Sequence, residues 1–378
     1  MALCVRHGPE SSVGAVTLPM RTPLDGCDTV HGPIHDPGDL DEAFHGYPQR
    51  KGISVSLGAA FDAFQKQVDA DPTQVKEARK RRETFKSALG AESDVVEVWG
   101  SGSLRRSTHI GPKIHDLDLV VVFEPNEHPG WGEPGDSAAD ALEVLGGKVT
   151  QLLGATNGTV EKLVRIAWPR NHAVKCFIDL PDDDDGFTVD AMPALKHNGA
   201  LLIPEKSSSV WIPADPQYLV AEVKKRNADW HYFLRMVRVL KAWRKRAEVE
   251  GKVKSLVMEV LALHHLPSGY SRPEALKRFF TAAATAVGNE PVTDPADLCG
   301  EIQPDLDRIG LRDSLLNAAD LADQACDAAD GGHIDDAKRL WREVFGSDFP
   351  APKGKPKISP ALIVPAVEPR PIKDAPQG

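Results

Sequence analysis

The stretch GSGSLRRSTHIGPKIHDLDLVVVF, residues 100–123, runs from a glycine- and serine-rich loop through two aspartates into an apolar segment. Apart from Asp118, residues 117–123 are all apolar, which is typical of a central strand covered on both faces. Side chains alternate along a strand, so Asp116 and Asp118 are expected to project from the same side at its beginning. Two ionised carboxylates this close raise each other's pKa unless a cation offsets their repulsion. The pair therefore predicts a ligand or a function.

The residues before the aspartates suit an anionic ligand. Gly102 would let the main chain approach an anion closely, and Ser103 with its neighbouring amides could donate hydrogen bonds to phosphate oxygens. The aspartates themselves suit hard divalent cations, chiefly Mg²⁺. An isolated D-x-D motif is more often just the start of a strand, because short motifs match by chance. The prediction therefore needs further support from the chain.

A third acid supplies that support. Asp190 lies within FTVDAMPAL, residues 187–195, where apolar neighbours and Pro193 indicate another strand. Three acids on adjacent strands beside a Gly-Ser loop would form a phosphoryl-transfer site with two Mg²⁺ or Mn²⁺ ions about 3.5–4 Å apart. We therefore predict that Asp116, Asp118 and Asp190 are the catalytic residues and metal ligands, and that Gly102 and Ser103 bind nucleotide.

The wider pattern predicts an α+β fold. Helical periodicity is found before the motif and again at 137–154, and strands are expected at 159–169, 172–180 and 186–195. From about residue 217 the pattern is helical throughout. The pattern therefore predicts a mixed sheet with helices, followed by a helical C-terminal lobe. The expected parts are a loosely ordered arm (1–48), a catalytic domain (49–216), a helical lobe (217–348) and a flexible proline-rich tail (349–378).

Composition excludes several classes of protein. Of the 378 residues, 41% are hydrophobic and 26% charged, as in ordinary globular proteins, and the formal net charge is −10. That charge disfavours extended nucleic acid as the main partner, because such binding needs a broad basic surface. The sequence shows neither a signal peptide nor an apolar segment of membrane-spanning length. The five scattered cysteines match no zinc or redox motif, so we expect a cytoplasmic protein with reduced thiols.

One helical segment is unusually basic. Residues 217–250 read as one long helix, in which Arg235, Arg238 and Lys241 recur every three residues. A basic stripe is more often a solvated face than a binding site, but beside a metal–triphosphate site we expect Lys241 to face phosphate. Other candidate base or metal contacts are more typical of packing. They are Trp211, Trp230, Trp243, His264 and His265.

The chain resembles a known family over about residues 55–300. It is similar to the polymerase-beta-type nucleotidyltransferases, and most of all to the bacterial cyclic-oligonucleotide synthases of anti-phage signalling, relatives of animal cyclic GMP-AMP synthase and the oligoadenylate synthases. Ser107 stands where relatives often have glycine. The similarity extends through GSLRRSTHIGPKIHDLDL, VDAMPAL, WIPADPQYLVAEVKKRN, VRVLKAWRK and KSLVMEVLALHHL.

The resemblance implies a fold, an activity and partners. The implied fold is a polymerase-beta-like nucleotidyltransferase palm, a mixed sheet with helices, with the active site in the cleft between this palm and the helical lobe. Asp190 corresponds to the family's third carboxylate, and Lys241 and Ser255 match a lysine and a serine that contact nucleotide phosphates. It implies that ATP, GTP or other ribonucleoside triphosphates are joined into a cyclic di- or trinucleotide second messenger, with release of pyrophosphate. It also suggests partners from an effector system, including an enzyme that conjugates the C-terminal Gly378, although a plain flexible end is the favoured interpretation of the tail.

Three alternatives stay open from the sequence. A tRNA or poly(A)-type polymerase would share the acids, but the net charge argues against it. An aminoglycoside-type or protein-modifying nucleotidyltransferase is usually smaller and would not explain the long similarity. A catalytically silent scaffold or nucleotide sensor would not need all three acids.

Overall fold

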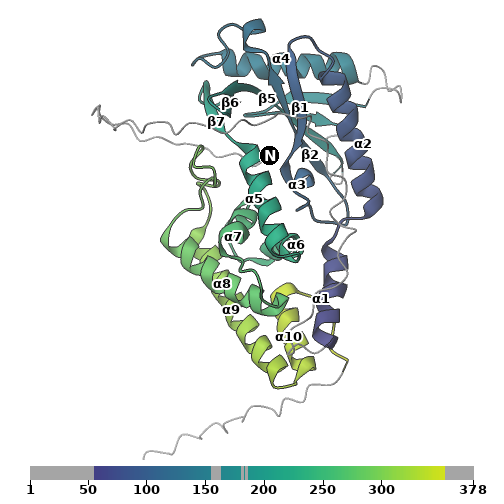
Figure 1. Cartoon of the computed structure of the whole chain (residues 1–378), viewed down its shortest axis with the longest axis vertical. Helices are drawn as coiled ribbons and strands as arrows, with labels where there is room; N and C mark the ends of the chain where they lie inside the picture. The colour runs from purple at the N-terminus through teal and green to yellow at the C-terminus, as the bar shows by residue number, and fades with distance from the viewer. Residues whose placement is uncertain (1–54, 155–162, 180–182, 184–185, 354–378) are drawn as a thin grey trace, which may run out of the picture. The chain divides into compact units, whose positions relative to one another are not determined.

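The computed structural model describes residues 55–154, 163–179, 183 and 186–353. The arm predicted for residues 1–48, most of the predicted tail and Gly378 lie outside the described residues. Within them the fold is α+β, as the sequence predicts, with a mixed sheet and two groups of helices (Figure 1). In this part of the chain, no helix combines the length and apolarity that a membrane span requires.

The described part contains a seven-stranded sheet with the path β1-β2-β5-β4-β3, and β5 continues into β6 and β7. The pairing of β2 with β5 is parallel, and the other pairings are antiparallel. The strands are β1 (Val95–Ser101), β2 (Asp116–Phe123), β3 (Ile166–Pro169), β4 (Val174–Phe177), β5 (Thr188–His197), β6 (Ala200–Glu205) and β7 (Val210–Ala214).

Helices precede the sheet, interrupt it and follow it. Asp71 caps the second helix by accepting hydrogen bonds from the N–H groups of Thr73 and Gln74, which satisfies donors that have no partner within the helix. The α-helices are α1 (Val55–Val68), α2 (Pro72–Leu89), α3 (Gly102–Arg105), α4 (Ser137–Leu153), α5 (Pro216–Asp229), α6 (Phe233–Trp243), α7 (Ser255–His265), α8 (Arg272–Asn289), α9 (Arg308–Asp330) and α10 (Ile334–Phe345).

Strand β2 is buried on both faces, each in a different core. Leu117, Leu119 and Val121 join the core formed with α2 and α4. Val120 and Val122 face the other way and join the core that contains the C-terminal helices. Because side chains alternate, Asp116 and Asp118 lie on the face of Val120, toward the helical side of the sheet. The two cores explain the unbroken apolar run after the aspartates.

The helical part differs from the sequence prediction in two places. The single helix expected over 217–250 is interrupted between α5 and α6, where Trp230 has an extended conformation (φ −150°, ψ 106°). The Trp230 side chain is buried and packs edge-on against Tyr232, with ring centroids 5.8 Å apart. Tertiary burial of this aromatic side chain therefore outweighs the helical preference of the segment, which contains neither glycine nor proline.

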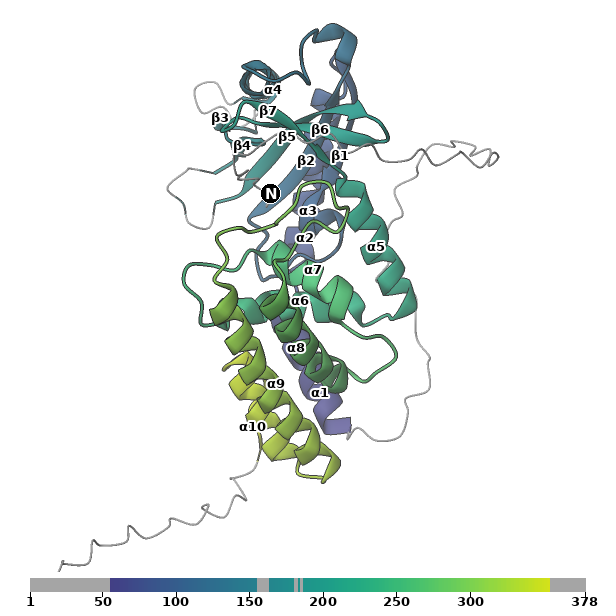
Figure 2. The same ribbon diagram turned by 90° about the vertical axis from the view of Figure 1, so that its left-hand side faces the viewer.

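The second difference concerns the two ends of the helical core. Helix α1, predicted as part of the catalytic domain, packs instead against α6 and α10. Phe349, predicted as the first residue of the tail, is fully buried, with its ring centroid 5.1 Å from that of Phe61 and 5.5 Å from that of Phe64. Helices α8, α9 and α10 lie side by side in this region (Figure 2).

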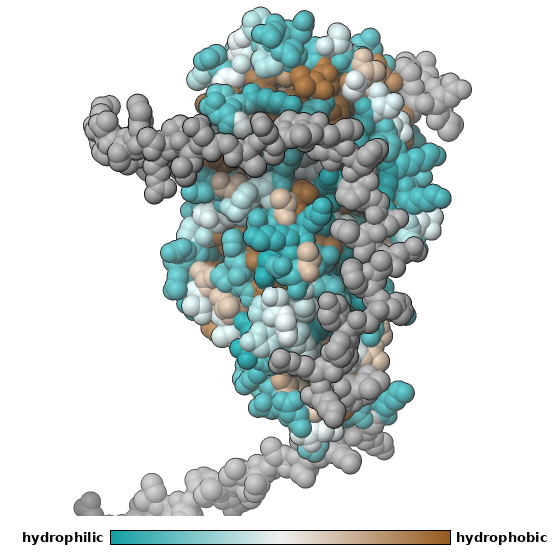
Figure 3. All heavy atoms as spheres, viewed as in Figure 1, coloured by the Kyte–Doolittle hydropathy of each residue, from teal (hydrophilic) through white to brown (hydrophobic). Residues whose placement is uncertain are grey.

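The face of the molecule shown in Figure 3 is mostly hydrophilic.

The aromatic cluster around Phe349 predicts a measurable stability effect. Phe349→Ala should lower the free energy of unfolding by about 3–5 kcal/mol, because it leaves a cavity in a fully packed core. Urea unfolding monitored by circular dichroism would measure it. Ile309→Ala is the control, because the Ile309 side chain is 68% exposed, and it should change stability by less than about 0.5 kcal/mol. Equal effects of the two substitutions would show that residue 349 belongs to the tail.

Candidate active site

The strand register brings two of the three predicted acids side by side. Asp118 of β2 and Asp190 of β5 are direct Cα partners in the parallel pairing. Partners in a sheet project from the same face and lie one strand spacing apart, about 4.8 Å. Asp118 is 7% exposed and Asp190 is half-buried. The strand adjacency expected from the sequence is therefore confirmed.

Asp116 lies on the same face, one row toward the start of the strand. Its Cα partner on β5 is Thr188. Although Asp116 retains exposed surface, the protein around its carboxyl group raises the pKa by desolvation, and the negative charges of Asp118 and Asp190 raise it further. The three acids thus act on one another electrostatically, as a site for a positively charged ligand requires.

Gly102 brings the main chain against one of these acids. Its φ of +67° lies in the left-handed region, and a Cβ atom at this position would lie 1.6 Å from Oδ2 of Asp118. Conformation and space both exclude a side chain here. Gly102 also begins α3, whose first N–H groups have no partner within the helix. The glycine-serine loop and the acids therefore form one continuous surface.

The donor set of this surface fits divalent cations. Carboxylate oxygens are the preferred protein ligands of Mg²⁺, and the adjacent pair Asp118 and Asp190 supplies them from neighbouring strands. No group of three or more His, Cys, Asp or Glu side chains in the described residues is arranged to hold a metal ion. The binding of metal by all three acids stays a prediction.

The loop after α3 is held by two basic residues of α6. Arg238 donates a hydrogen bond to the main-chain oxygen of Ser107 (Nη1–O distance 2.9 Å), and Lys241 donates to that of Thr108 (Nζ–O distance 2.7 Å). Ser107 has a φ of 56°, a left-handed conformation that favours glycine. The spacing of three residues on α6 thus matches two consecutive carbonyl groups of the loop.

Glu259 of α7 completes this contact from the other side. Its buried carboxylate accepts hydrogen bonds from the Arg106 guanidinium and from Thr108 Oγ1, the latter at 3.0 Å, and lies 3.3 Å from Lys241 Nζ. Burial raises the pKa of Glu259, but the positive charges of Arg106 and Lys241 outweigh burial and hold the pKa at about 2. We call Arg106, Thr108, Arg238, Lys241 and Glu259 the loop clamp.

Lys241, which was expected to face phosphate, contacts other residues of the loop clamp in this structure. The side chain is 2% exposed and binds the loop and Glu259. Burial lowers its pKa, which the charge of Glu259 partly offsets. Ser255 lies at the first position of α7 and is half-buried. The phosphate contacts implied for Lys241 and Ser255 stay predictions.

The sequence analysis missed Arg106, Glu259 and His109. Glu259 is buried in α7, and the signal available in the sequence was a single acid flanked on both sides by apolar residues. Burial lowers the pKa of His109 to about 4, and the positive charges of Arg238 and Lys241 contribute, so the imidazole is neutral at pH 7. By contrast, Trp211, Trp230 and Trp243 are buried, which agrees with packing roles.

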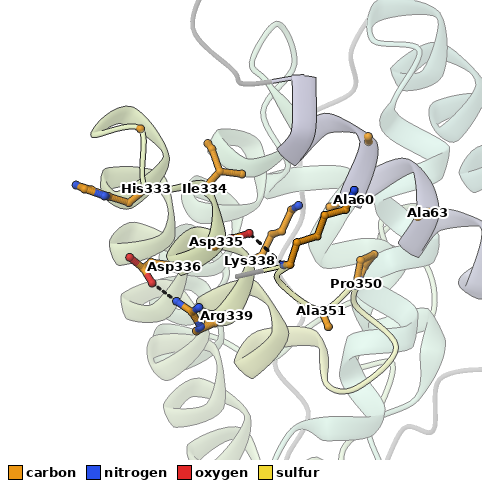
Figure 4. A pocket seen from close by; sticks show the side chains of 13 residues that line it. Ala60, Ala63, His333, Ile334, Asp335, Asp336, Lys338, Arg339, Pro350 and Ala351 are labelled. Carbon is orange, nitrogen blue, oxygen red and sulfur yellow. Dashed lines mark hydrogen bonds and ion pairs between the residues drawn. The ribbon is translucent and has the colours of Figure 1, made fainter. Parts of the chain in front are cut away.

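A hollow of about 750 Å³ lies elsewhere, between α1, α10 and the segment after α10 (Figure 4). Two of its aspartates already have partners: Asp336 pairs with the Arg339 guanidinium, and Asp335 Oδ1 accepts a hydrogen bond from the main-chain N–H of Lys353 at 3.3 Å. The last of its lining residues, Lys353, is also the last residue that the structure describes. We therefore do not assign it to the site.

Comparisons with known proteins support the fold. No family model and no curated protein matches the chain, whereas solved structures do. CdnC of E. coli MS115-1, solved with ATP, has a TM-score of 0.61 at 17% identity, covering 78% of this chain and 98% of that chain. CdnC in complex with HORMA-deltaN gives a TM-score of 0.59 at 18% identity, with the same coverage.

Two further structures have the same fold. The CD-NTase CdnG of Bradyrhizobium diazoefficiens, in complex with GTP, has a TM-score of 0.55 at 13% identity, covering 76% of this chain and 98% of that chain. DncV of Vibrio cholerae, a cyclic AMP-GMP synthase, has a TM-score of 0.50 at 13% identity, covering 79% and 82%. The chain therefore has the fold of the CD-NTases, and at these identities the likeness concerns the fold alone.

The contact between Gly102 and Asp118 predicts the effect of the smallest side chain. Gly102→Ala should reduce nucleotidyl transfer by on the order of 10²-fold, because the methyl group would displace the carboxylate or the loop by about 1 Å or more. Steady-state pyrophosphate release would measure the loss. Gly147→Ala on α4 is the control, since a Cβ there meets nothing within 4 Å. Unchanged activity of Gly102→Ala would contradict the close contact.

The loop clamp predicts a pH-dependent stability. Because the pKa of Glu259 falls from 4.5 to about 2 on folding, the ionised carboxylate stabilises the fold above about pH 4.5. Glu259→Gln should therefore cost about 3 kcal/mol at pH 7. The difference between wild type and variant should shrink as the pH falls from about 4.5 to about 2.

Urea unfolding at several pH values would measure this difference. Glu77→Gln is the control, because Glu77 is 48% exposed in a surface ion pair with Arg81 and should cost at most about 1 kcal/mol at any pH. A difference for Glu259→Gln that stayed constant from pH 7 to pH 2 would refute the assigned charge state.

Proposed function

We propose that the chain is a metal-dependent nucleotidyltransferase that joins ribonucleoside triphosphates into a cyclic di- or trinucleotide. The observation that carries this proposal is the pairing of Asp118 with Asp190 directly beside the φ-positive Gly102. Such a surface offers carboxylates for divalent cations and main-chain donors for phosphate within one strand spacing. The CD-NTase fold supports the proposal independently.

The residues of the site have distinct tasks in this reaction. The N–H groups around Gly102 and the hydroxyl of Ser103 bind the phosphates that leave as pyrophosphate. Asp116 and Asp118 hold cations, and Asp190, on the next strand, also orients the attacking ribose hydroxyl and accepts its proton. The loop clamp keeps residues 106–108 in place, so that Ser103 is pre-positioned before the nucleotide binds.

The cations would contribute charge neutralisation on the phosphates and a lower pKa for the attacking hydroxyl. The residues of the chain supply geometry: they align the hydroxyl with the α-phosphorus and the leaving oxygen. Two successive transfers, the second within the linear intermediate, would close the ring. From the family resemblance of the sequence, we propose a role as second-messenger synthase in anti-phage defence, acting in the cytoplasm with effector-system proteins as partners.

Product analysis tests this function. Purified protein incubated with all four ribonucleotides and Mg²⁺ or Mn²⁺ should release pyrophosphate and form a phosphatase-resistant cyclic product, identified by mass spectrometry. Asp118→Asn and Asp190→Asn should each lower the rate by at least about 10³-fold, since Asp118 would hold the cations and Asp190 would accept the proton of the attacking hydroxyl. Asp327→Asn, an exposed aspartate on α9, is the matched control and should be fully active.

The possible outcomes separate the alternatives. Linear products only would favour a polymerase-like or small-molecule transferase. Nucleotide binding without pyrophosphate release under any condition would indicate a silent sensor. Full activity of Asp190→Asn would overturn the site, because no other group in the proposal accepts the proton of the hydroxyl.

A further inference from the structure

Asp118 and Asp190 belong to a row of Cα partners that runs across the strands of the sheet. Ser101 is the Cα partner of Asp118, Asp118 of Asp190, Asp190 of Lys175 on β4, and Lys175 of Trp168 on β3. Partners in neighbouring strands point to the same face of a sheet. All five side chains therefore belong to one face, in the order loop, acid, acid, cation, aromatic ring.

The far end of this row offers an open aromatic surface. Trp168 is 41% exposed, although tryptophan is usually well buried. The ring contacts Phe177 edge-on, with centroids 4.9 Å apart, and the Arg170 guanidinium lies 5.2 Å from its centroid. Lys175 Nζ lies 5.6 Å from the Phe177 centroid. Aromatic rings beside cations are the usual surface for a nucleobase with its phosphate.

The order of residues along this row indicates whether the surface around Trp168 faces the donor nucleotide, whose phosphates leave, or the acceptor nucleotide, which supplies the attacking hydroxyl. In an in-line displacement the attacking and leaving oxygens lie on opposite sides of the phosphorus. The leaving phosphates belong at the Gly102 loop, on the β1 side of the acid pair. The attacking hydroxyl then belongs on the side of Asp190, toward β4 and β3 (Figure 2). Trp168 lies two strand spacings, about 10 Å, from Asp190, a distance that a nucleoside can span.

We propose that Trp168 and Lys175 form the acceptor subsite, in which Trp168 stacks on the base of the nucleotide that supplies the attacking hydroxyl and Lys175 binds its phosphate. This inference rests on the proposed function and names the substrate site within it. In the transfer, the acceptor oxygen bonds to the α-phosphorus of the donor, and the bond from that phosphorus to the bridging oxygen breaks. Pyrophosphate leaves with the electron pair, and the hydroxyl proton passes to Asp190.

Two other uses of Trp168 are structural. The ring could only cover Phe177, or the end strand β3 could pair with a second copy of the chain. Packing around Phe177 would account for the ring contacts of both Trp168 and Lys175, but neither use requires these two side chains to share the face of the acids. The continuity of the row therefore favours the acceptor subsite.

Separate donor and acceptor nucleotides test the subsite. A 2′,3′-dideoxyribonucleoside triphosphate can donate its nucleotidyl group, but it cannot act as acceptor because it lacks the attacking hydroxyl. A ribonucleoside monophosphate has that hydroxyl and can act as acceptor, but it has no pyrophosphate to release and cannot act as donor. With the full chain, Trp168→Ala should raise the KM for the monophosphate acceptor by about 5- to 150-fold, the loss of one base stack. The KM for the dideoxy donor should stay within about threefold. Trp168→Phe should restore most of the acceptor affinity, and Lys175→Met should weaken it.

Controls distinguish this result from damage to the fold. Val96→Ala alters an exposed apolar residue (46% exposed) on β1, at the opposite end of the sheet path, and should leave both KM values unchanged. Thermal melting and sedimentation of each variant report folding and oligomeric state. Equal rises in donor and acceptor KM, or a shift in oligomeric state with unchanged KM, would overturn the subsite while the proposed function stands.

A direct readout does not depend on turnover. An 8-azido purine ribonucleoside monophosphate, photoactivated on the wild-type chain, should label the β3–β4 peptides, and unmodified monophosphate should compete. Labelling of other peptides only would overturn the subsite. This result does not depend on pyrophosphate release, so the subsite and the proposed function can fail separately.

Discussion

The parallel pairing of β2 with β5 is the constraint on which the site depends. It places Asp118 beside Asp190 although 72 positions separate them in the chain, and it sets which face of each strand meets which core. A shift of one residue in this register would turn Asp190 to the opposite face, where Val189 and Ala191 pack against the core formed with α2 and α4. The apolar side chains on both faces thus hold the acids in register.

The acids at the start of the apolar strand follow from this arrangement. Val120 and Val122 join the core with the helical part, whereas Asp116 and Asp118 occupy the same face beyond the edge of that core. Main-chain contact with Gly102 covers Asp118 from the β1 side. Charge repulsion that would destabilise an ordinary core is therefore concentrated where a cationic ligand can offset it.

The loop clamp couples this surface to the helical part. Glu259 carries the negative charge, Arg106 belongs to the loop, and Lys241 comes from a different helix. A buried acid between two basic groups is stable only while all of its partners are in place, so the clamp makes the loop conformation dependent on the packing of α6 and α7. The conformation of the loop after α3 and the stability of the helical part are in this way linked by one carboxylate.

The sequence alone determined the α+β class, most helices, the two-sided burial of β2 and the acids as its distinctive residues, because these depend on local periodicity and on polar residues within apolar runs. It did not determine the break at Trp230, the burial of Phe349, the charge set around Glu259 or the row from Asp190 to Trp168. Each of these joins residues far apart in the chain, through a register or a packing contact that has no local signal. Tertiary structure decided them because burial and pairing between distant segments outweigh the weaker preferences of each segment.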